Sequence, residues 1–170
     1  MNIFIEANGR KYEMRGLTCM SIFSHLLATG EDKMNFRSWT TSYRGYVLFH
    51  SSASDIEDCI FEDYDIPIED SPKSSILGYG VLFDVVKLDT KELFEAYYDD
   101  HKCATYEYEE ISQNYNGKLY GHRFKDAVIF PPIVGVPGSR NYWTPKKEVQ
   151  VEAFKLVKKF HNTGVWESNV

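Results

Sequence analysis

The stretch that decides the fold runs from Gly30 to Ser52 and reads GEDKMNFRSWTTSYRGYVLFHSS. Its last part, 46–52 (YVLFHSS), is mostly apolar and has no Asp, Glu, Lys or Arg, which predicts a largely buried strand. Just before Gly30, the apolar residues of LTCMSIFSHLLATG recur at helical spacing and predict a short helix near 19–28. Thr18 is its expected N-cap, and Gly30 is the expected C′ residue. The stretch therefore joins a short helix to a buried strand.

The rest of the chain predicts many short strands and few helices. Asn8-Gly9 predicts a hairpin between 2–6 and 11–15, because both turn positions accept a positive φ. A long strand at 75–88 contains Gly78 and Gly80, which predict the bends that a small barrel needs. The further predicted elements are a helix at 91–101, strands at 104–111, 118–124 and 127–130, the last of them ended by Pro131-Pro132, and a final helix that begins at Thr144-Pro145. This order predicts an α+β fold.

The charge is unevenly distributed along the 170 residues. The chain has a formal net charge of −6, but residues 55–126 carry 18 acidic and only 7 basic residues, while both ends are positive. The average argues against a protein that coats nucleic acid non-specifically, since such proteins are normally basic. A local basic site built from the two ends stays compatible with the sequence. The acidic stretch 55–72 is typical of a solvated loop or a short exposed helix.

Several kinds of site and segment are missing from the sequence. The three cysteines, Cys19, Cys59 and Cys103, form no C-x-x-C pair, so we expect reduced thiols and no bound metal. Phosphate-loop, zinc-protease and hydrolase-elbow motifs are also missing, and we expect no cofactor. No apolar run approaches the roughly 18 residues of a membrane span, and the start lacks a signal-peptide core. We therefore expect a cytoplasmic protein that does not enter membranes.

The opening stretch resembles the ASCH family (activating signal cointegrator homology), whose members have a PUA-like barrel. The family hallmark is G-x-K-x-x-E-x-R followed by Ser-Trp, then by Tyr-Arg-Gly. Gly30 and Arg37 have the hallmark spacing, and Ser38-Trp39 and Tyr43-Arg44-Gly45 follow. ILGYGVLFDVV and FPPIVGVPGSRNYW resemble later family segments. The resemblance implies a small mixed β-barrel of about five to seven strands with flanking helices, spanning 1–143, with 144–170 providing an amphipathic helix that packs on the barrel.

The hallmark is incomplete in this chain. A gapless alignment puts Asp32 where the family has Lys, and Asn35 where it has Glu. Some ASCH relatives hydrolyse acylated cytidine nucleosides of the N4-acetylcytidine type, and others have been assigned ribonuclease activity. If this chain is a hydrolase, Lys33 would take the catalytic role. The departures leave open whether it is an enzyme.

The same resemblance implies a nucleic-acid site between the first helix and the barrel. Arg37 and Arg44 offer forked donors to phosphate or to a base edge, Trp39 and Tyr43 offer stacking surfaces, and Asn35 offers both a donor and an acceptor. The remaining candidates, Ser38, His50 and Ser51, offer hydrogen bonds. The predicted ligand is RNA, or a single-stranded or modified nucleobase. Four of these residues also have an alternative structural role. Arg37 would form a loop-locking cation–π pair, Trp39 and Tyr43 would be packing residues, and His50 would be a core histidine.

A third hypothesis concerns the acidic middle of the chain. The stretch 55–70 has eight acidic residues and no Lys or Arg. A surface of one charge attracts partners of the other charge. The chain would then be a protein-interaction module whose partner is a basic protein.

Overall fold

The computed structural model describes residues 4–7, 10–54, 58–160 and 167–169, and its main feature is a curled, mixed, six-stranded sheet. The strands lie in the order β4-β7-β6-β5-β3-β8. Their bounds are β3 Arg15–Cys19, β4 Met34–Arg37, β5 Gly45–Ser51, β6 Ser75–Lys87, β7 Tyr120–Ile133 and β8 Tyr142–Trp143. β3 and β5 are parallel, and the other neighbouring pairs are antiparallel. The predicted α+β fold with a small barrel-like sheet is confirmed.

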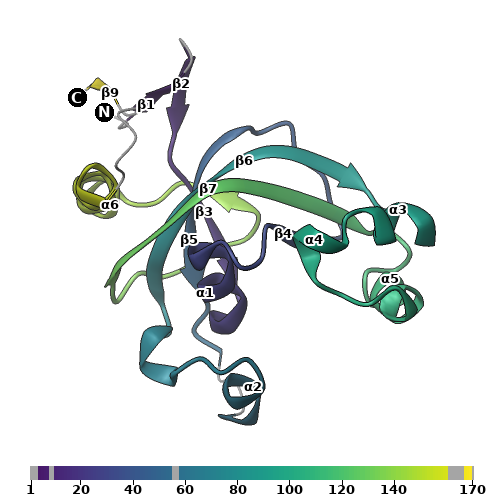
Figure 1. Cartoon of the computed structure of the whole chain (residues 1–170). Helices are drawn as coiled ribbons and strands as arrows, with labels where there is room; N and C mark the ends of the chain where they lie inside the picture. The colour runs from purple at the N-terminus through teal and green to yellow at the C-terminus, as the bar shows by residue number, and fades with distance from the viewer. Residues whose placement is uncertain (1–3, 8–9, 55–57, 161–166, 170) are drawn as a thin grey trace.

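The long strands β6 and β7 curve across the whole molecule (Figure 1). Their pairing changes register between Ile76 and Gly78 and again between Tyr79 and Val81. A side chain at Gly78 would collide with the backbone oxygen of Val128, so only glycine allows this approach. The predicted glycine bends are therefore confirmed.

Helices cover both faces of the sheet. All seven residues of β5 are buried, as expected for a strand without a solvent face. Leu48 packs in one core cluster with α6 (Lys147–Phe160), whereas its neighbours Val47 and Phe49 pack in another with α1 (Ser21–Thr29). Because side chains alternate along a strand, the two helices lie on opposite faces. A third cluster lies at the other end of the long strands from α6, under α3 (Lys91–Ala96) and α5 (Tyr108–Asn114) (Figure 1).

The first helix ends as predicted but begins later. Gly30 follows α1 in the left-handed conformation, with φ of 79°. The N-cap is Met20, which gives no side-chain cap, and not Thr18. Thr18 belongs instead to β3, where its hydroxyl faces Nδ1 of His50 at 3.1 Å. The N-cap prediction was wrong because the strand extends to Cys19 and uses the threonine in its own packing.

Two predictions for the second half of the chain were wrong. Residues 104–111 form a 3₁₀ helix (Thr105–Glu107) and the start of α5, not a strand. The segments 118–124 and 127–130 form one strand, β7, which continues past Pro131-Pro132 to Ile133. The prolines are exposed, and the pairing with β6 skips them. Proline is tolerated where no ladder hydrogen bond is needed.

Several other predicted elements are present. β1 (Phe4–Ala7) and β2 (Arg10–Glu13) pair as the predicted hairpin, whose turn residues 8–9 lie outside the described residues. β9 (Glu167–Asn169) pairs with β1. The predicted helix at 91–101 is divided into α3 and α4 (Tyr98–His101). The last helix begins at Lys147 and buries an apolar stripe, and its predicted stop, Gly164, lies outside the described residues.

The acidic stretch lies on the surface. It forms α2 (Asp58–Asp63) and a 3₁₀ helix (Ile68–Asp70), with 55–57 outside the described residues. Its side chains from Glu62 to Asp65 are exposed, and so are Glu69 and Asp70. The chain's described helices are all too short or too polar to cross a lipid bilayer.

Candidate functional site

A cavity of about 390 Å³ lies between α1 and the edge strand β4. Phe23 and Leu27 of α1 form one wall, and Met34, Asn35 and Phe36 of β4 form another. The third wall comes from the segment 101–115, and Asp32 and Tyr64 complete the lining. We call this space the α1–β4 cavity. It lies where the sequence predicts a pocket, between the first helix and the barrel.

Asn35 and Arg37 form a fixed pair beside this cavity. Arg37 donates from Nε to Oδ1 of Asn35 at 2.7 Å, and from Nη2 to the backbone oxygen of Thr18 at 2.8 Å. Nη2 also lies 3.2 Å from Sγ of Cys19, a thiol whose pKa burial raises. Arginine only donates, so the Asn35 oxygen must face Arg37. The amide nitrogen of Asn35 is then the group left to donate to a ligand in the cavity.

Asp32 is a cavity residue that the sequence marked only as a departure from the family hallmark. Its backbone N–H donates to the Leu26 oxygen at 3.2 Å, which ties it to the end of α1. Within the described part of the chain, its carboxylate has no hydrogen bond or ion pair. Burial, and then the nearby charge of Glu31, raises the pKa of Asp32 to about 6, while Lys102 opposes this rise. Such a carboxyl in a cavity is a typical functional-site signal.

Lys33, the predicted catalytic residue, lies outside the cavity that Asp32 lines. Its side chain is exposed and is not part of the cavity lining. Its backbone joins two elements, because the N–H donates to the Asp100 oxygen and the carbonyl accepts from the N–H of Phe124. Asp32, and not Lys33, is therefore the charged hallmark residue that faces the cavity.

Trp39 is held by its neighbours. His122 donates from Nε2 to the backbone oxygen of Trp39 at 2.8 Å and accepts at Nδ1 from the hydroxyl of Tyr142, also at 2.8 Å. The Trp39 ring packs edge-on against both of these rings. Burial, with the charges of Arg37 and Arg44, lowers the pKa of His122 to about 4, although the hydrogen bond to Trp39 opposes this change. His122 is therefore neutral at pH 7.

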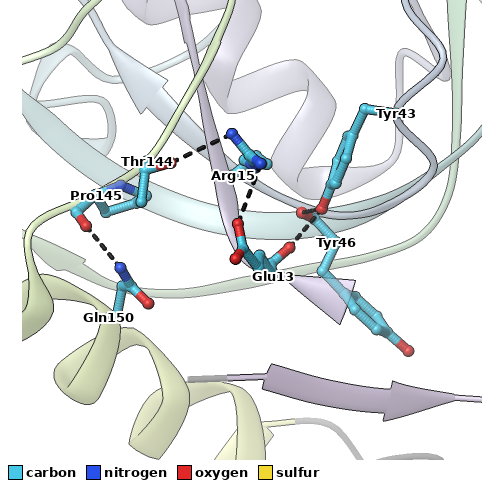
Figure 2. A network of polar contacts seen from close by, with 7 residues as sticks. All are labelled: Glu13, Arg15, Tyr43, Tyr46, Thr144, Pro145 and Gln150. Atoms are coloured by element: carbon cyan, nitrogen blue, oxygen red, sulfur yellow. Dashed lines mark hydrogen bonds and ion pairs between the residues drawn. The ribbon is translucent and has the colours of Figure 1, made fainter. Parts of the chain in front are cut away.

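Tyr43 lies in a second hollow of about 440 Å³, lined by Arg15, residues 39–43, Asn141 and Tyr142. The Tyr43 hydroxyl lies 2.5 Å from the backbone oxygen of Glu13 and 2.7 Å from that of Tyr46. The guanidinium of Arg15 lies 5.6 Å from the centre of the Tyr43 ring and pairs with Glu13 at 3.1 Å (Figure 2). Tyr43 therefore already has a cation partner for its ring.

A polar network links this hollow to the last helix (Figure 2). Arg15 donates from Nη1 to the hydroxyl of Thr144 at 3.3 Å. The side chain of Gln150 donates to the backbone oxygen of Pro145 at 2.7 Å. These contacts fasten β3 to the chain segment that leads into α6.

Arg44 and Ser38 lie on the loop after β4. Arg44 donates from Nη1 to the backbone oxygens of Thr41 and Tyr43, both at 2.8 Å, and so fixes the loop shape. No described carboxylate forms an ion pair with Arg44 or with Arg37, so both keep their charge for a ligand. Ser38 is exposed.

His50 and Ser51 are fully buried and lie apart from both hollows. His50 donates from Nε2 to the Val136 oxygen at 2.6 Å and accepts at Nδ1 from Thr18. Burial lowers the pKa of His50. The hydroxyl of Ser51 faces the backbone oxygens of Pro72 and Ser75. The structure thus gathers Asn35, Arg37 and Trp39, places the loop residues beside them, and gives the last two candidates structural partners.

The sequence did not reveal the far wall of the α1–β4 cavity. It comes from α4, α5 and the turn between them, part of which was predicted as a strand. Arg123 holds α4 in place through ion pairs of 3.1 Å with Asp84 and Asp100. Burial raises the pKa of Cys103 to about 11, so this thiol is not an activated nucleophile. The described residues contain no cluster that would hold a metal ion.

Comparison with solved structures finds the same fold in the ASCH protein of Zymomonas mobilis. A serine-to-alanine variant of that protein is 15% identical, with a TM-score of 0.55 over 86% of this chain and 96% of that chain. The ASCH protein itself is 14% identical, with a TM-score of 0.54 over 81% and 91%. A tyrosine-to-phenylalanine variant is 15% identical, with a TM-score of 0.54 over 86% and 98%. No family model and no curated protein matches the sequence. The predicted ASCH resemblance is confirmed for the fold.

Proposed function

We propose that this chain binds a nucleobase in the α1–β4 cavity, as part of RNA or as a single-stranded or modified base. The observation that carries the proposal is the Asn35–Arg37 pair, which presents an oriented amide donor in a cavity beside an uncompensated positive charge. The cavity volume of about 390 Å³ falls within the range of small-molecule sites. Phe23, Tyr64 and Tyr115 line it and offer ring surfaces for stacking.

The loop after β4 provides the continuation of this site. Ser38 is exposed, Trp39 is half-buried, and Arg44 carries a charge without a described carboxylate partner. A phosphate or a second base of the same strand would contact these groups and the edge of Tyr43. Such a site reads one or two nucleotides, which fits the acidic net charge better than a long basic groove does.

Binding of short RNA and DNA oligomers, modified bases included, tests the proposal. We expect Asn35→Ala and Arg37→Ala to weaken binding by about tenfold or more, because each removes a positioned donor. Lys155→Ala is the control, since Lys155 is exposed on α6, on the opposite face of the sheet from α1. Equal affinities for wild type, Asn35→Ala and Arg37→Ala would remove this cavity from consideration. The exposed position of Lys33 gives no support to the hydrolase alternative, and incubation with N4-acetylcytidine or single-stranded RNA tests it directly.

We propose a second role for the acidic surface, which is docking of a basic partner protein. Two neighbouring hollows, of about 410 and 330 Å³, share Glu69 in their lining. Exposed Ile68 and Ile129 lie beside acidic residues in these hollows. This combination is complementary to a segment that carries both apolar and basic side chains.

Salt dependence tests this second role. A basic amphipathic peptide should bind at low salt and be released at high salt, because charge attraction supplies much of the affinity. Neutralising Glu62, Asp65, Glu69 and Asp70 to their amides should abolish binding, whereas neutralising Glu109 and Glu110 on α5 should not. Failure to bind at low salt would contradict the proposal.

A further inference from the structure

The carboxylate of Asp32 is a partly buried acceptor that receives no hydrogen bond from the described part of the protein. No other described residue gives its carboxylate a hydrogen bond or an ion pair, although it lines the α1–β4 cavity. The other cavity carboxylate, that of Glu107, accepts from the backbone N–H of Ala104 at 2.7 Å. A half-buried carboxylate is stabilised when something donates to it. A ligand in this cavity would replace water as the donor to Asp32.

Asn35 provides the complementary group. Its oxygen is engaged by Arg37, so its amide nitrogen donates and does not accept. The cavity therefore presents one charged acceptor, Asp32, and one neutral donor, Asn35. A matching ligand has N–H donors beside an acceptor atom.

Nucleobases with an exocyclic amino group have this pattern. Cytosine, adenine and guanine each carry an –NH₂ group next to a ring nitrogen or to a further ring N–H. In uracil and thymine the one available ring N–H lies between two carbonyl oxygens. A carboxylate that approached this N–H would set its second oxygen against one of those carbonyls.

We propose that Asp32 selects nucleobases that carry an exocyclic amino group and rejects uracil and thymine. This inference rests on the proposed function, since it assumes that the α1–β4 cavity holds the base. The amino N–H donates to the Asp32 carboxylate, while the adjacent acceptor of the base receives the Asn35 amide. A charge-assisted hydrogen bond is roughly twice as strong as a neutral one, so Asp32 is the main source of the preference.

The ionisation of Asp32 gives the selection a pH dependence. Only the carboxylate accepts from an amino group at both oxygens, and burial raises the pKa of Asp32 to about 6. The titratable or charged groups near it, on the elements that surround the cavity, are Glu31, Tyr64, His101, Lys102, Cys103, Glu107 and Tyr115. Burial lowers the pKa of His101, so this ring carries less positive charge beside Asp32 than an exposed histidine would. Selectivity should therefore weaken as the pH falls through about 6.

Matched ligand pairs test the inference. Cytidine and uridine differ at the position that carries the amino group, and guanosine and inosine differ by one amino group. We expect wild type to prefer the amino member of each pair by about tenfold or more at pH 7.5, and by less at pH 5. Asp32→Asn should reduce the preference to about threefold or less, because an amide donates to a carbonyl as readily as it accepts. Asn35→Ala should weaken guanosine and inosine alike, because N3 accepts in both, and should weaken cytidine more than uridine, whose N3 carries a hydrogen.

The outcomes separate the inference from the proposed function. Equal, measurable binding of cytidine and uridine by wild type would overturn the selection by Asp32 and leave base binding intact. Binding of no nucleoside and of no C- or U-octanucleotide would overturn both. A readout that does not depend on a variant is the carboxyl ¹³C resonance of Asp32, whose pKa should fall when cytidine saturates the protein. An unchanged Asp32 pKa in the cytidine complex would also contradict the inference.

Discussion

Arg37 holds Asn35 by a 2.7 Å hydrogen bond from its Nε to the Asn35 Oδ1, across one intervening residue of β4. The same guanidinium reaches the backbone oxygen of Thr18 in β3. Arg37 therefore connects the edge strand to the end of β3 and sets the orientation of the amide that faces the cavity. The planar shape of the Arg37 guanidinium, and not only its charge, therefore sets the position of the Asn35 amide.

Replacing Arg37 with lysine separates shape from charge. Lysine keeps the positive charge but lacks the planar fork that reaches two acceptors at once. We expect Arg37→Lys to weaken binding of a short single-stranded RNA by about tenfold, close to the effect of Arg37→Ala, when measured by titration calorimetry. Lys155→Arg, an exchange between the same two side chains at an exposed position of α6, should bind as wild type does. If Arg37→Lys binds as tightly as wild type, Arg37 acts through charge alone and does not position Asn35.

Asp32 should make the folded state less stable at neutral pH. Burial raises its pKa from 3.8 to about 6, so the folded protein takes up a proton at a pH where the unfolded chain does not. The contribution of Asp32 to stability is therefore most favourable below about pH 4 and declines as the pH rises through 6. We expect Asp32→Asn to raise the free energy of unfolding at pH 7.5 by about 1–2 kcal/mol, after allowing for solvent that reaches the carboxylate.

Urea unfolding at several pH values measures this effect. The gain from Asp32→Asn should shrink as the pH falls and disappear near pH 4. Asp63→Asn, at an exposed position of α2, should change the free energy of unfolding by less than about 0.5 kcal/mol at every pH. A destabilised Asp32→Asn at pH 7.5 would show that the carboxylate has a favourable partner in the folded protein.

The elements that the sequence predicted best are those with a local signal. The helix α1 has apolar residues at helical spacing and a glycine that takes the left-handed conformation after it. The strand β5 is apolar throughout because both of its faces are covered. In both cases the information lies within a few neighbouring residues.

The errors arose where tertiary packing decides the structure. In ATYEYEEI, aromatic and acidic residues alternate as in a strand, but Tyr108 and Ile111 pack three residues apart on one face of α5. Tyr106, which the alternation would bury, is 81% exposed. The edge strand β4 has only four residues and depends on its pairing with β7.

The candidate site was predictable only in part. The hallmark spacing identified Asn35, Arg37 and Trp39 as neighbours, since one strand carries the first two and the third follows directly. The role of Asp32 was not predictable, because its raised pKa depends on burial by a wall that is distant in sequence. Buried partners such as Val136 for His50 also come from remote segments.

His122 should make the protein sensitive to acid. Burial lowers its pKa to about 4, whereas an unfolded histidine titrates near 6.5. Its contribution to stability is therefore fully present above about pH 6.5 and is lost as the pH falls toward 4, which is the opposite sign to that of Asp32. We expect His122→Gln to lower stability at pH 7.5 by about 1–3 kcal/mol, because the Gln amide does not hold its acceptor and its donor at the two positions where the ring nitrogens meet the Tyr142 hydroxyl and the Trp39 oxygen.

The pH dependence of the free energy of unfolding distinguishes a buried neutral His122 from a residue that only fills space. In His122→Gln, the free energy of unfolding should change less between about pH 7 and 5 than it does in wild type. His50 and His101 titrate in the same direction, since burial lowers the pKa of each, so part of the slope should remain. A variant with the wild-type slope would show that His122 is not the neutral histidine that the hydrogen bonds to Trp39 and Tyr142 require.

Gly78 places α1 against the sheet, and this placement forms the cavity. A Cβ at this position would meet the backbone oxygen of Val128 and would lie 3.0 Å from the Cβ of Ala28. The backbone oxygen cannot give way without breaking the pairing of β6 with β7, and the contact with Ala28 would push α1 outward. We expect Gly78→Ala to lower the free energy of unfolding by about 3 kcal/mol and to weaken nucleobase binding as well, because Phe23 and Leu27 of α1 line the cavity.

Gly117→Ala is the control, because it replaces a glycine at a position where the added Cβ would not collide with any described atom. Gly117 has a φ of 71°, and no atom lies within 4 Å of a Cβ added there. Its substitution should lower stability by roughly 1 kcal/mol through backbone strain and leave ligand affinity unchanged. Gly78→Ala could instead unfold no more easily than Gly117→Ala and bind the ligand as wild type does. The close contact at Gly78 would then not set the position of α1, and the packing of α1 on β5 would fix the cavity wall.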